Sequence, residues 1–181
     1  MSLRLRCAIL FAALALTALA IPAAGTADSA SEAQGSKKVP LVATPKGVGA
    51  LRLGATVASL HRHHLIRRLR PGCELDPGQR IARLRPPLQG YAIFSHPSSR
   101  LSSLSISGGA ETAKRIGIGS TPGEARAAYP RAAYQPPGSA EPFAEGFFWV
   151  NRIGHSKMTF VVDPESLAIS AIAIPFPAFC E

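Results

Sequence analysis

The sequence predicts an α+β fold of two layers, in which two tandem repeats each pack a helix on an antiparallel sheet. The first observation is an internal repeat. Residues 116–121, Ile-Gly-Ile-Gly-Ser-Thr, follow the pattern of residues 51–56, Leu-Arg-Leu-Gly-Ala-Thr, which lie 65 positions earlier. Apolar residues at helical spacing follow each copy, and segments of alternating character typical of strands follow each helical stretch. We therefore expect a first α+β repeat over residues 47–109 and a second over residues 110–181.

The chain begins with the pattern of a secretory signal peptide. Arg4 and Arg6 precede an apolar run over residues 7–21, and small residues suited to cleavage lie from about Ala20 to Ala27. That run is short for a bilayer span, and no later segment is long and apolar enough to cross a membrane. We expect residues 1–20 to be removed as a signal peptide and the mature protein to be secreted or periplasmic, with no membrane span.

The composition of residues 21–46 is typical of a disordered tether. Ala, Ser, Gly, Thr and Lys dominate there, aromatic residues are absent, and Pro40 and Pro45 lie near its end. The apolar surface is too small to offset the entropy lost on ordering such a segment.

Export changes the interpretation of the cysteines. Cys7 leaves with the signal peptide, so Cys73 and Cys180 remain as an even pair in an oxidising compartment. We expect a disulfide between them that joins the two repeats and stabilises the fold by up to ~4.7 kcal/mol. A zinc site is the weaker interpretation, because neither cysteine has a second ligand at metal spacing.

The first repeat should open with a strand at residues 51–53. Thr56 is placed to cap the helix that follows, which should end at Pro71-Gly72. Apolar residues at helical spacing along that stretch are Val57, Leu60, Leu65 and Leu69. Strands are then expected over residues 80–85, 90–95 and 101–107.

The second repeat should have a shorter helix. Thr121 and Glu124 form a capping box, with Pro122 at the first helical position, and Pro130 ends the helix near Tyr129. Strands are expected over residues 147–151, 157–162 and 168–174, with a tight turn at 163–166.

Several of these features resemble a family of small exported proteins of uncharacterised role. They are the two repeat openings, Gly72-Cys73 after the first helix, Ala128-Tyr129-Pro130 after the second, and the terminal Cys180. The double unit is also similar to the β-lactamase inhibitory protein and to the small lipoprotein of the outer-membrane barrel-assembly machinery. This resemblance covers residues 47–181 and implies helix-on-sheet repeats that work by binding other proteins.

Aromatic residues in the predicted strands indicate a partner surface. Phe147 and Trp149 alternate with Phe148 and so share one sheet face, and Tyr91 lies in another strand. If the helices cover one face only, Tyr91, Phe147 and Trp149 can form an exposed patch that contacts a partner. Core packing, or coverage by the other repeat, is the alternative.

Arginines make residues 60–85 strongly basic, within a chain whose formal net charge is +9, or +7 once Arg4 and Arg6 are removed. Guanidinium forks bind sulfate, phosphate or carboxylate groups in a bidentate manner. An arginine-rich helix could therefore bind an anionic envelope polymer or nucleic acid, whereas a solvated basic face is the alternative. The candidate residues are Arg62, Arg67, Arg68, Arg70, Arg83 and Arg85.

A third hypothesis is a metal-dependent hydrolase. His61 and His64 would share a helix face and could ligate one ion, but no adjacent Glu could act as a general base. We therefore predict no catalytic residue, no metal and no cofactor. The preferred interpretation is a non-catalytic module that binds another exported or envelope protein, and the sequence indicates no oligomeric state.

Overall fold

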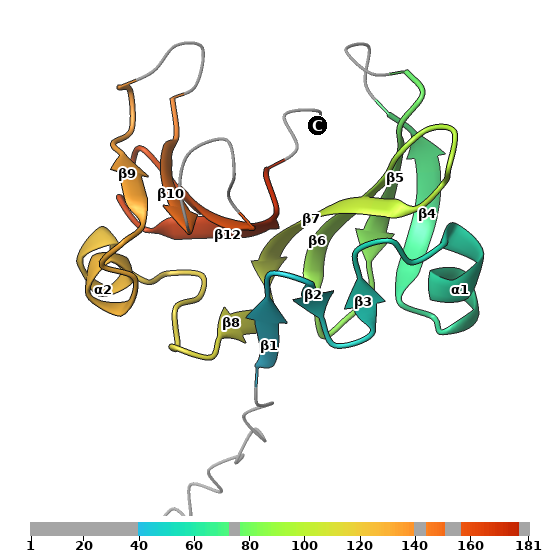
Figure 1. Cartoon of the computed structure of the whole chain (residues 1–181), viewed down its shortest axis with the longest axis horizontal. Helices are drawn as coiled ribbons and strands as arrows, with labels where there is room; N and C mark the ends of the chain where they lie inside the picture. Colours follow the sequence, from blue (N-terminus) through green and yellow to red (C-terminus); the bar gives the residue numbers. More distant parts are fainter. Residues whose placement is uncertain (1–39, 73–76, 140–143, 151–156, 178–181) are drawn as a thin grey trace, which may run out of the picture. The chain divides into compact units, whose positions relative to one another are not determined.

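The computed structural model describes residues 40–72, 77–139, 144–150 and 157–177, which belong to one compact unit. The described residues form twelve strands and only two short helices, α1 (Val57–Arg62) and α2 (Pro122–Ala128) (Figure 1). The predicted α+β class is therefore wrong, because the fold is mostly β. Six and seven residues make helices of about two turns, too short to form a layer over a sheet.

Eight strands form one antiparallel sheet, here called the large sheet, in the order β4-β5-β6-β7-β12-β11-β10-β9. Strands β4 to β7 follow one another along the chain and make one half, and strands β9 to β12 make the other half. The strands are β4 (Ile66–Pro71), β5 (Arg80–Leu84), β6 (Gln89–Phe94), β7 (Leu101–Gly108), β9 (Ala133–Gln135), β10 (Gly146–Val150), β11 (Met158–Val162) and β12 (Ile169–Ile174).

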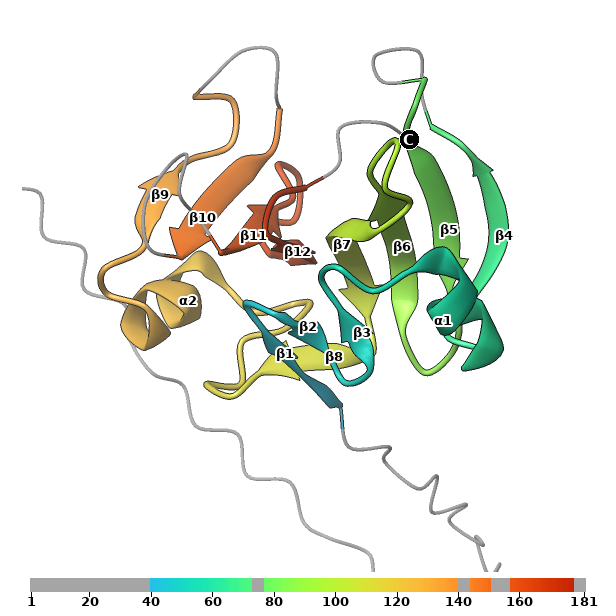
Figure 2. The ribbon, with the colours of Figure 1, turned by 45° about the vertical axis from the view of Figure 1, so that its right-hand side comes forward.

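Four short strands form a second sheet in the order β3-β2-β1-β8, in which β1 and β8 run parallel. Its strands are β1 (Leu41–Thr44), β2 (Gly47–Val48), β3 (Leu51–Arg52) and β8 (Ala110–Thr112). This small sheet lies on the same side of the large sheet as the core, and α1 and α2 lie beside the β4 end and the β9 end (Figures 1 and 2).

The first helix ends earlier than its apolar spacing predicts. Thr56 caps α1 as expected, its hydroxyl accepting from the Ser59 N–H at 3.2 Å. The backbone then turns at His64, whose φ is 53°, and Ile66 pairs with Leu84 to begin β4. Leu65 and Leu69, assigned to the helix by their spacing, therefore flank or occupy a strand.

A bulge in β4 explains why the apolar residues of this strand are spaced in the sequence as they would be in a helix. The register of the β4–β5 pair shifts between Arg67 and Arg70, and Arg68 within the bulge has a φ of 52°. An extra residue in one strand breaks the alternation of period two on which strand recognition depends. The sequence pattern of residues 65–71 was therefore ambiguous, and tertiary pairing decided it.

The second helix confirms its predicted cap. The Glu124 N–H donates to Thr121 Oγ1 at 3.2 Å, and the Thr121 N–H donates to Glu124 Oε2 at 2.7 Å. Tyr129 caps the other end, so the predicted stop at Pro130 is also confirmed. Only Ala125 of α2 is buried, which is why this helix contributes little to the core.

The two repeat openings have different structures. Leu51 and Arg52 form β3 and pair with β2, whereas residues 116–118 form no strand and contribute one bridge, from Gly117 to Glu111. Residues 41–44, which we assigned to the disordered tether, instead form β1 between β2 and β8. The predicted strands in residues 80–107 and 157–174 are confirmed to within about one residue.

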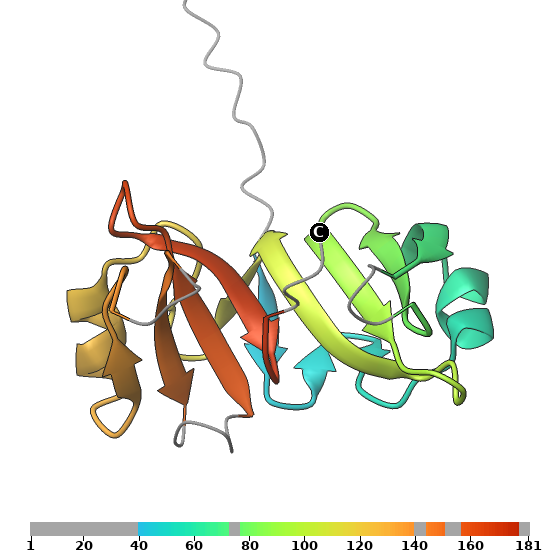
Figure 3. The same cartoon turned by 90° about the horizontal axis from the view of Figure 1, so that it is seen from above.

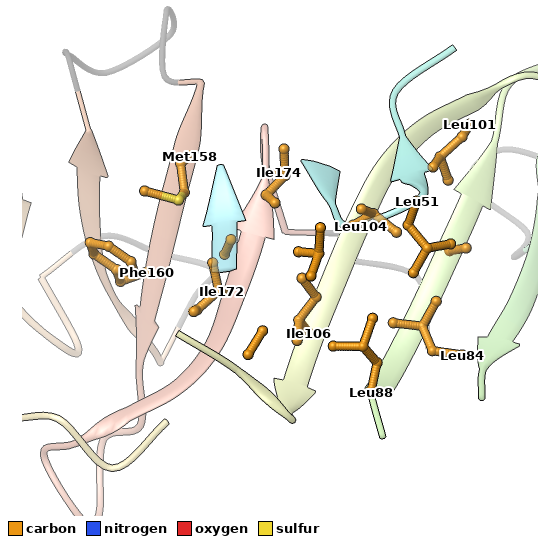
Figure 4. Close-up of a cluster of buried hydrophobic side chains, with 14 of the residues drawn as sticks. Leu51, Leu84, Leu88, Leu101, Leu104, Ile106, Met158, Phe160, Ile172 and Ile174 are labelled. Carbon is orange, nitrogen blue, oxygen red and sulfur yellow. The ribbon is translucent and has the colours of Figure 1, made fainter. Parts of the chain in front are cut away.

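The two halves of the large sheet meet at the β7–β12 pair. Ile106 lies opposite Ile172 and Leu104 opposite Ile174, and all four side chains are fully buried. Figure 4 shows them on neighbouring strands, with Phe160 and Met158 on one side and further leucines on the other. A single core therefore continues across both halves.

Replacing Ile106 with Ala should destabilise the protein by about 2–5 kcal/mol, because it leaves a cavity where the two halves meet. Unfolding in urea, followed by tryptophan fluorescence, measures the loss. The exposed neighbour Ser107 provides the matched control, since Ser107→Ala should change the free energy of unfolding by less than about 0.5 kcal/mol. Equal midpoints for Ile106→Ala and wild type would contradict the packing described.

Replacing Glu124 with Gln should remove a pH-dependent contribution to stability. Hydrogen bonds from the Thr121 backbone N–H and hydroxyl hold the pKa of Glu124 below its ordinary value of 4.5. This contribution is complete above the ordinary pKa and is lost as the pH falls through the lowered, folded-state pKa. The difference in Tm between wild type and Glu124→Gln should therefore shrink below about pH 4.5, and a difference that does not vary with pH would refute the cap's electrostatic role.

Candidate functional site

The face of the large sheet opposite the core is called here the open face. Side chains alternate along each strand, so Ser105, between Leu104 and Ile106, belongs to this face. Residues that lie opposite each other on paired strands share a face. Tyr91 and Ala173, which pair with Ser105 on its two sides, therefore also belong to the open face. Neither α1 nor α2 crosses this face in the view of Figure 3.

A cavity of about 490 Å³ lies on the open face across five neighbouring strands. Its middle is lined by short side chains, among them Ser105, Ser107 and Ala171, while Tyr91 and Phe147 stand on either side. Long side chains flanking short ones leave a hollow in an otherwise flat sheet. The remaining lining residues are Gly90, Glu145, Val161, Asp163, Pro164, Ser170 and Pro177.

Arginines surround Tyr91 at one end of this cavity. Arg83 lies opposite Tyr91 in the β5–β6 pair, and Arg67 lies opposite Arg83. The Arg83 and Arg70 guanidinium carbons lie 5.8 and 5.9 Å from the centre of the Tyr91 ring, within cation–π range. These three arginines and Tyr91 are called the arginine cluster below.

A second cavity, of about 340 Å³, adjoins the first. It is lined by Arg67 and Arg83 and shares Gly90, Tyr91 and Ser107 with the larger cavity. Because the two cavities share these three lining residues they are neighbours, and together they are called the groove below; their lining residues extend from Arg67 and Arg83 to Phe147 in β10.

Carboxylates line the other end of the groove. Asp163 Oδ1 accepts from the Ser166 N–H at 2.7 Å, from the Ser166 hydroxyl at 2.8 Å and from the Glu165 N–H at 3.2 Å. These hydrogen bonds, led by the one from the Ser166 backbone, hold the pKa of Asp163 below its ordinary value. Asp163 is therefore charged at neutral pH, and it lines this end of the groove together with the half-buried Glu145.

The structure places Phe147 and Trp149, two of the three aromatic residues predicted to form a patch, side by side, and Tyr91 at a distance from them. Phe147 is buried, with 2% of its surface exposed, and its ring centre lies 5.3 Å from that of Trp149. Tyr91 lies in β6, the strand next to β7, and belongs to the arginine cluster. Phe147 and Tyr91 both line the groove, whereas Trp149 does not.

Trp149 is instead covered by a segment of the chain itself. Its ring centre lies 5.8 Å from that of Phe176. Two hydroxyls on the open face fix this segment, because Thr159 Oγ1 donates to the Pro175 carbonyl at 2.9 Å and Ser103 Oγ to the Phe176 carbonyl at 2.7 Å. Residues 175–177 thus bound the groove, with Pro177 in its lining.

The predicted arginine-rich helix is wrong, because strands carry most of these arginines. Arg62 ends α1, Arg68 lies in the β4 bulge, and Arg85 follows β5 with its Nε donating to the Ile66 carbonyl at 3.4 Å. None of the three lines the groove. The other candidates, Arg67, Arg70 and Arg83, are the ones that the strands gather around Tyr91.

The histidine pair does not share a helix face. His61 lies in α1, but the helix ends at Arg62 and the positive φ of His64 turns the chain away. Among the described residues, no group of three or more His, Cys, Asp or Glu side chains could hold a metal ion. Cys73 and Cys180 lie outside the described residues, so their disulfide stays a prediction.

Sequence reasoning missed Gly90, Glu145 and Asp163 as site residues. Gly90 has a φ of 120° at a register shift between β6 and β7, and a Cβ there would lie 2.0 Å from the Ser105 carbonyl oxygen. A lone glycine inside a strand pattern indicates such a close approach of two backbones. The two acidic residues lie outside the strands, at their ends, where alternation carries no information.

Comparison with protein-family models, with curated proteins and with solved structures found no match to this chain. The helices of the described residues are all too short to span a lipid bilayer.

Replacing Gly90 with Ala should distort the groove floor and destabilise the fold. Gly119 is the matched control: it also has a positive φ, of 87°, but a Cβ there meets nothing within 4 Å. Both variants lose about 1–3 kcal/mol from the unfavourable φ, and Gly90→Ala loses clearly more through its clash with Ser105. Urea unfolding of the two variants compares the losses directly, and equal losses would contradict the close approach at Gly90.

Proposed function

We propose that this chain is a non-catalytic binding module that holds a partner protein in the groove on its open sheet face. The single observation that carries the proposal is the adjacency of two cavities, of about 490 and 340 Å³, which share Gly90, Tyr91 and Ser107. Adjacent cavities that extend over several strands provide an extended contact surface rather than a pocket for one small group.

The floor of the groove favours binding because it is rigid before any partner arrives. Ser105, Val161 and Ala171 lie in strands that pair on both sides within the large sheet. A surface built on paired strands loses little conformational entropy on binding, so more of the contact energy appears as affinity.

The composition of the groove is also that of a protein interface. Tyrosine and arginine are enriched among residues that dominate binding energy, and the guanidinium groups of Arg70 and Arg83 lie within 6 Å of the Tyr91 ring centre. Seven strand spacings of ~4.8 Å make the large sheet about 34 Å wide, which is enough for a standard interface.

Binding of an anionic polymer is the second candidate. It is supported by the gathering of Arg67, Arg70 and Arg83 on one face, where three guanidinium groups would attract phosphate, sulfate or carboxylate. Affinity of this kind falls steeply with added salt, because bound counterions are released.

Filling the groove should abolish capture of a partner. Ser107 is exposed and lines both cavities, so Ser107→Trp places a large ring in the groove without touching the core. We expect a protein captured by the wild-type chain from envelope or culture extracts to be lost with Ser107→Trp, by at least tenfold in recovered amount. The extracts are chosen because the sequence predicts export.

Ala127→Trp is the matched control, because Ala127 is exposed on α2 and lines none of the cavities described. It adds the same ring and should leave capture unchanged. Equal capture by Ser107→Trp and wild type would refute the groove as the binding site.

A further inference from the structure

We infer that the groove binds an extended peptide of mixed charge, whose acidic end lies in the arginine cluster and whose basic end lies at Glu145 and Asp163. This inference rests on the proposed function and adds the chemistry of the segment that is bound. Three parts of the groove carry it: the arginines, the short side chains in the middle, and the carboxylates.

Among the residues that the structure describes, no acidic side chain forms an ion pair with the arginine cluster. Arg67 and Arg83 lie directly opposite each other on paired strands, and no salt bridge to either is found among the described residues. Like charges directly opposite on a sheet repel, so a carboxylate between them removes an unfavourable interaction and forms charge-assisted hydrogen bonds. The guanidinium fork matches a carboxylate in a bidentate manner.

The middle of the groove suits a peptide backbone. Ser105, Ser107 and Ala171 project little above the sheet, and Phe147 and Val161 add apolar surface beside them. From β5 to β10 the groove spans five strand spacings, or about 24 Å. An extended chain of about seven residues covers that length.

The charge at the far end distinguishes a peptide from a polyanion. A phosphate or sulfate polymer that crossed the groove would leave the arginines and meet two carboxylates, one of them fixed in charged form by Ser166. Repulsion there would cancel part of the attraction at the other end. A peptide that carries opposite charges at its two ends is attracted by both.

The Tyr91 ring also argues against nucleic acid. Single strands bind proteins by stacking bases on aromatic faces, and the Tyr91 ring already has two guanidinium carbons within 6 Å of its centre. A base that stacked on this ring would compete with the guanidinium groups for it, whereas a carboxylate would bind to those groups directly.

The test uses the full chain and unlabelled heptapeptides, blocked at both ends, in isothermal titration calorimetry. The probes are acetyl-Glu-Glu-Ala-Leu-Ala-Lys-Lys-amide and its reversed sequence, because either chain direction fits the groove. An uncharged peptide with Gln at all four charged positions, an all-acidic peptide and heparin are the comparisons. We expect one of the two mixed-charge peptides to bind at least tenfold more tightly than the uncharged and all-acidic ones.

Charge reversal then identifies the site. The Arg67→Glu, Arg83→Glu double variant should lose at least tenfold in affinity for the preferred peptide, and should regain it when lysines replace the glutamates of that peptide. Arg62→Glu with Arg115→Glu makes the same change in net charge at exposed residues outside the groove and should have no such effect. Glu145→Lys should weaken binding of the basic end, again with rescue by glutamates there.

Failure to bind either mixed-charge peptide, equal binding of the uncharged peptide, or preference for the all-acidic peptide or heparin would each overturn the inference. The proposed function fails separately. If Ser107→Trp abolishes partner capture but the Arg67→Glu, Arg83→Glu variant does not, the groove binds a partner without the charge pairing proposed here. If Ser107→Trp has no effect, the groove itself is not the binding site.

Discussion

The pairing of β7 with β12 is the contact on which the rest of the large sheet depends. Every other neighbour in that sheet is also the next strand along the chain, so each half forms through local hairpins. Among the described strands of the large sheet, this pair alone joins residues about 70 positions apart, such as Leu104 and Ile174. Closing so long a loop costs conformational entropy, which the burial of four aliphatic side chains at the junction must offset.

The same pair connects stability with the candidate site. Because side chains alternate, the residues between the buried isoleucines and leucines of β7 and β12 form the middle of the groove on the opposite face. The core requires large side chains at every second position of these strands and sets no such requirement at the positions between them. Serine and alanine occupy these intervening positions on the open face. Because their side chains are short, a hollow is left between Tyr91 and Phe147.

Much of the local structure could be predicted from the sequence, but the fold class could not. The cap at Thr121 and the strand of residues 101–108 follow from interactions between near neighbours, which the sequence displays directly. The end of α1 depends instead on His64 and on pairing of Ile66 with Leu84, and neither is visible in the apolar spacing. The candidate site could be predicted only in part, because local patterns are visible in the sequence and the pairing of distant strands is not. The alternation of residues identified Tyr91 and Phe147, whereas only the order of strands in the sheet brings Arg83 and Glu145 to one groove.

The bulge at Arg68 has a consequence for behaviour at high concentration. Strand β4 is the outermost strand at one side of the described sheet, and such a strand offers unpaired backbone groups to a neighbouring molecule. The register shift, the run of positive side chains and the final Pro71 make this border a poor template for adding a strand from a second chain. The irregularity that obscured β4 in the sequence thus also makes this border unfavourable for the strand addition from which fibres grow.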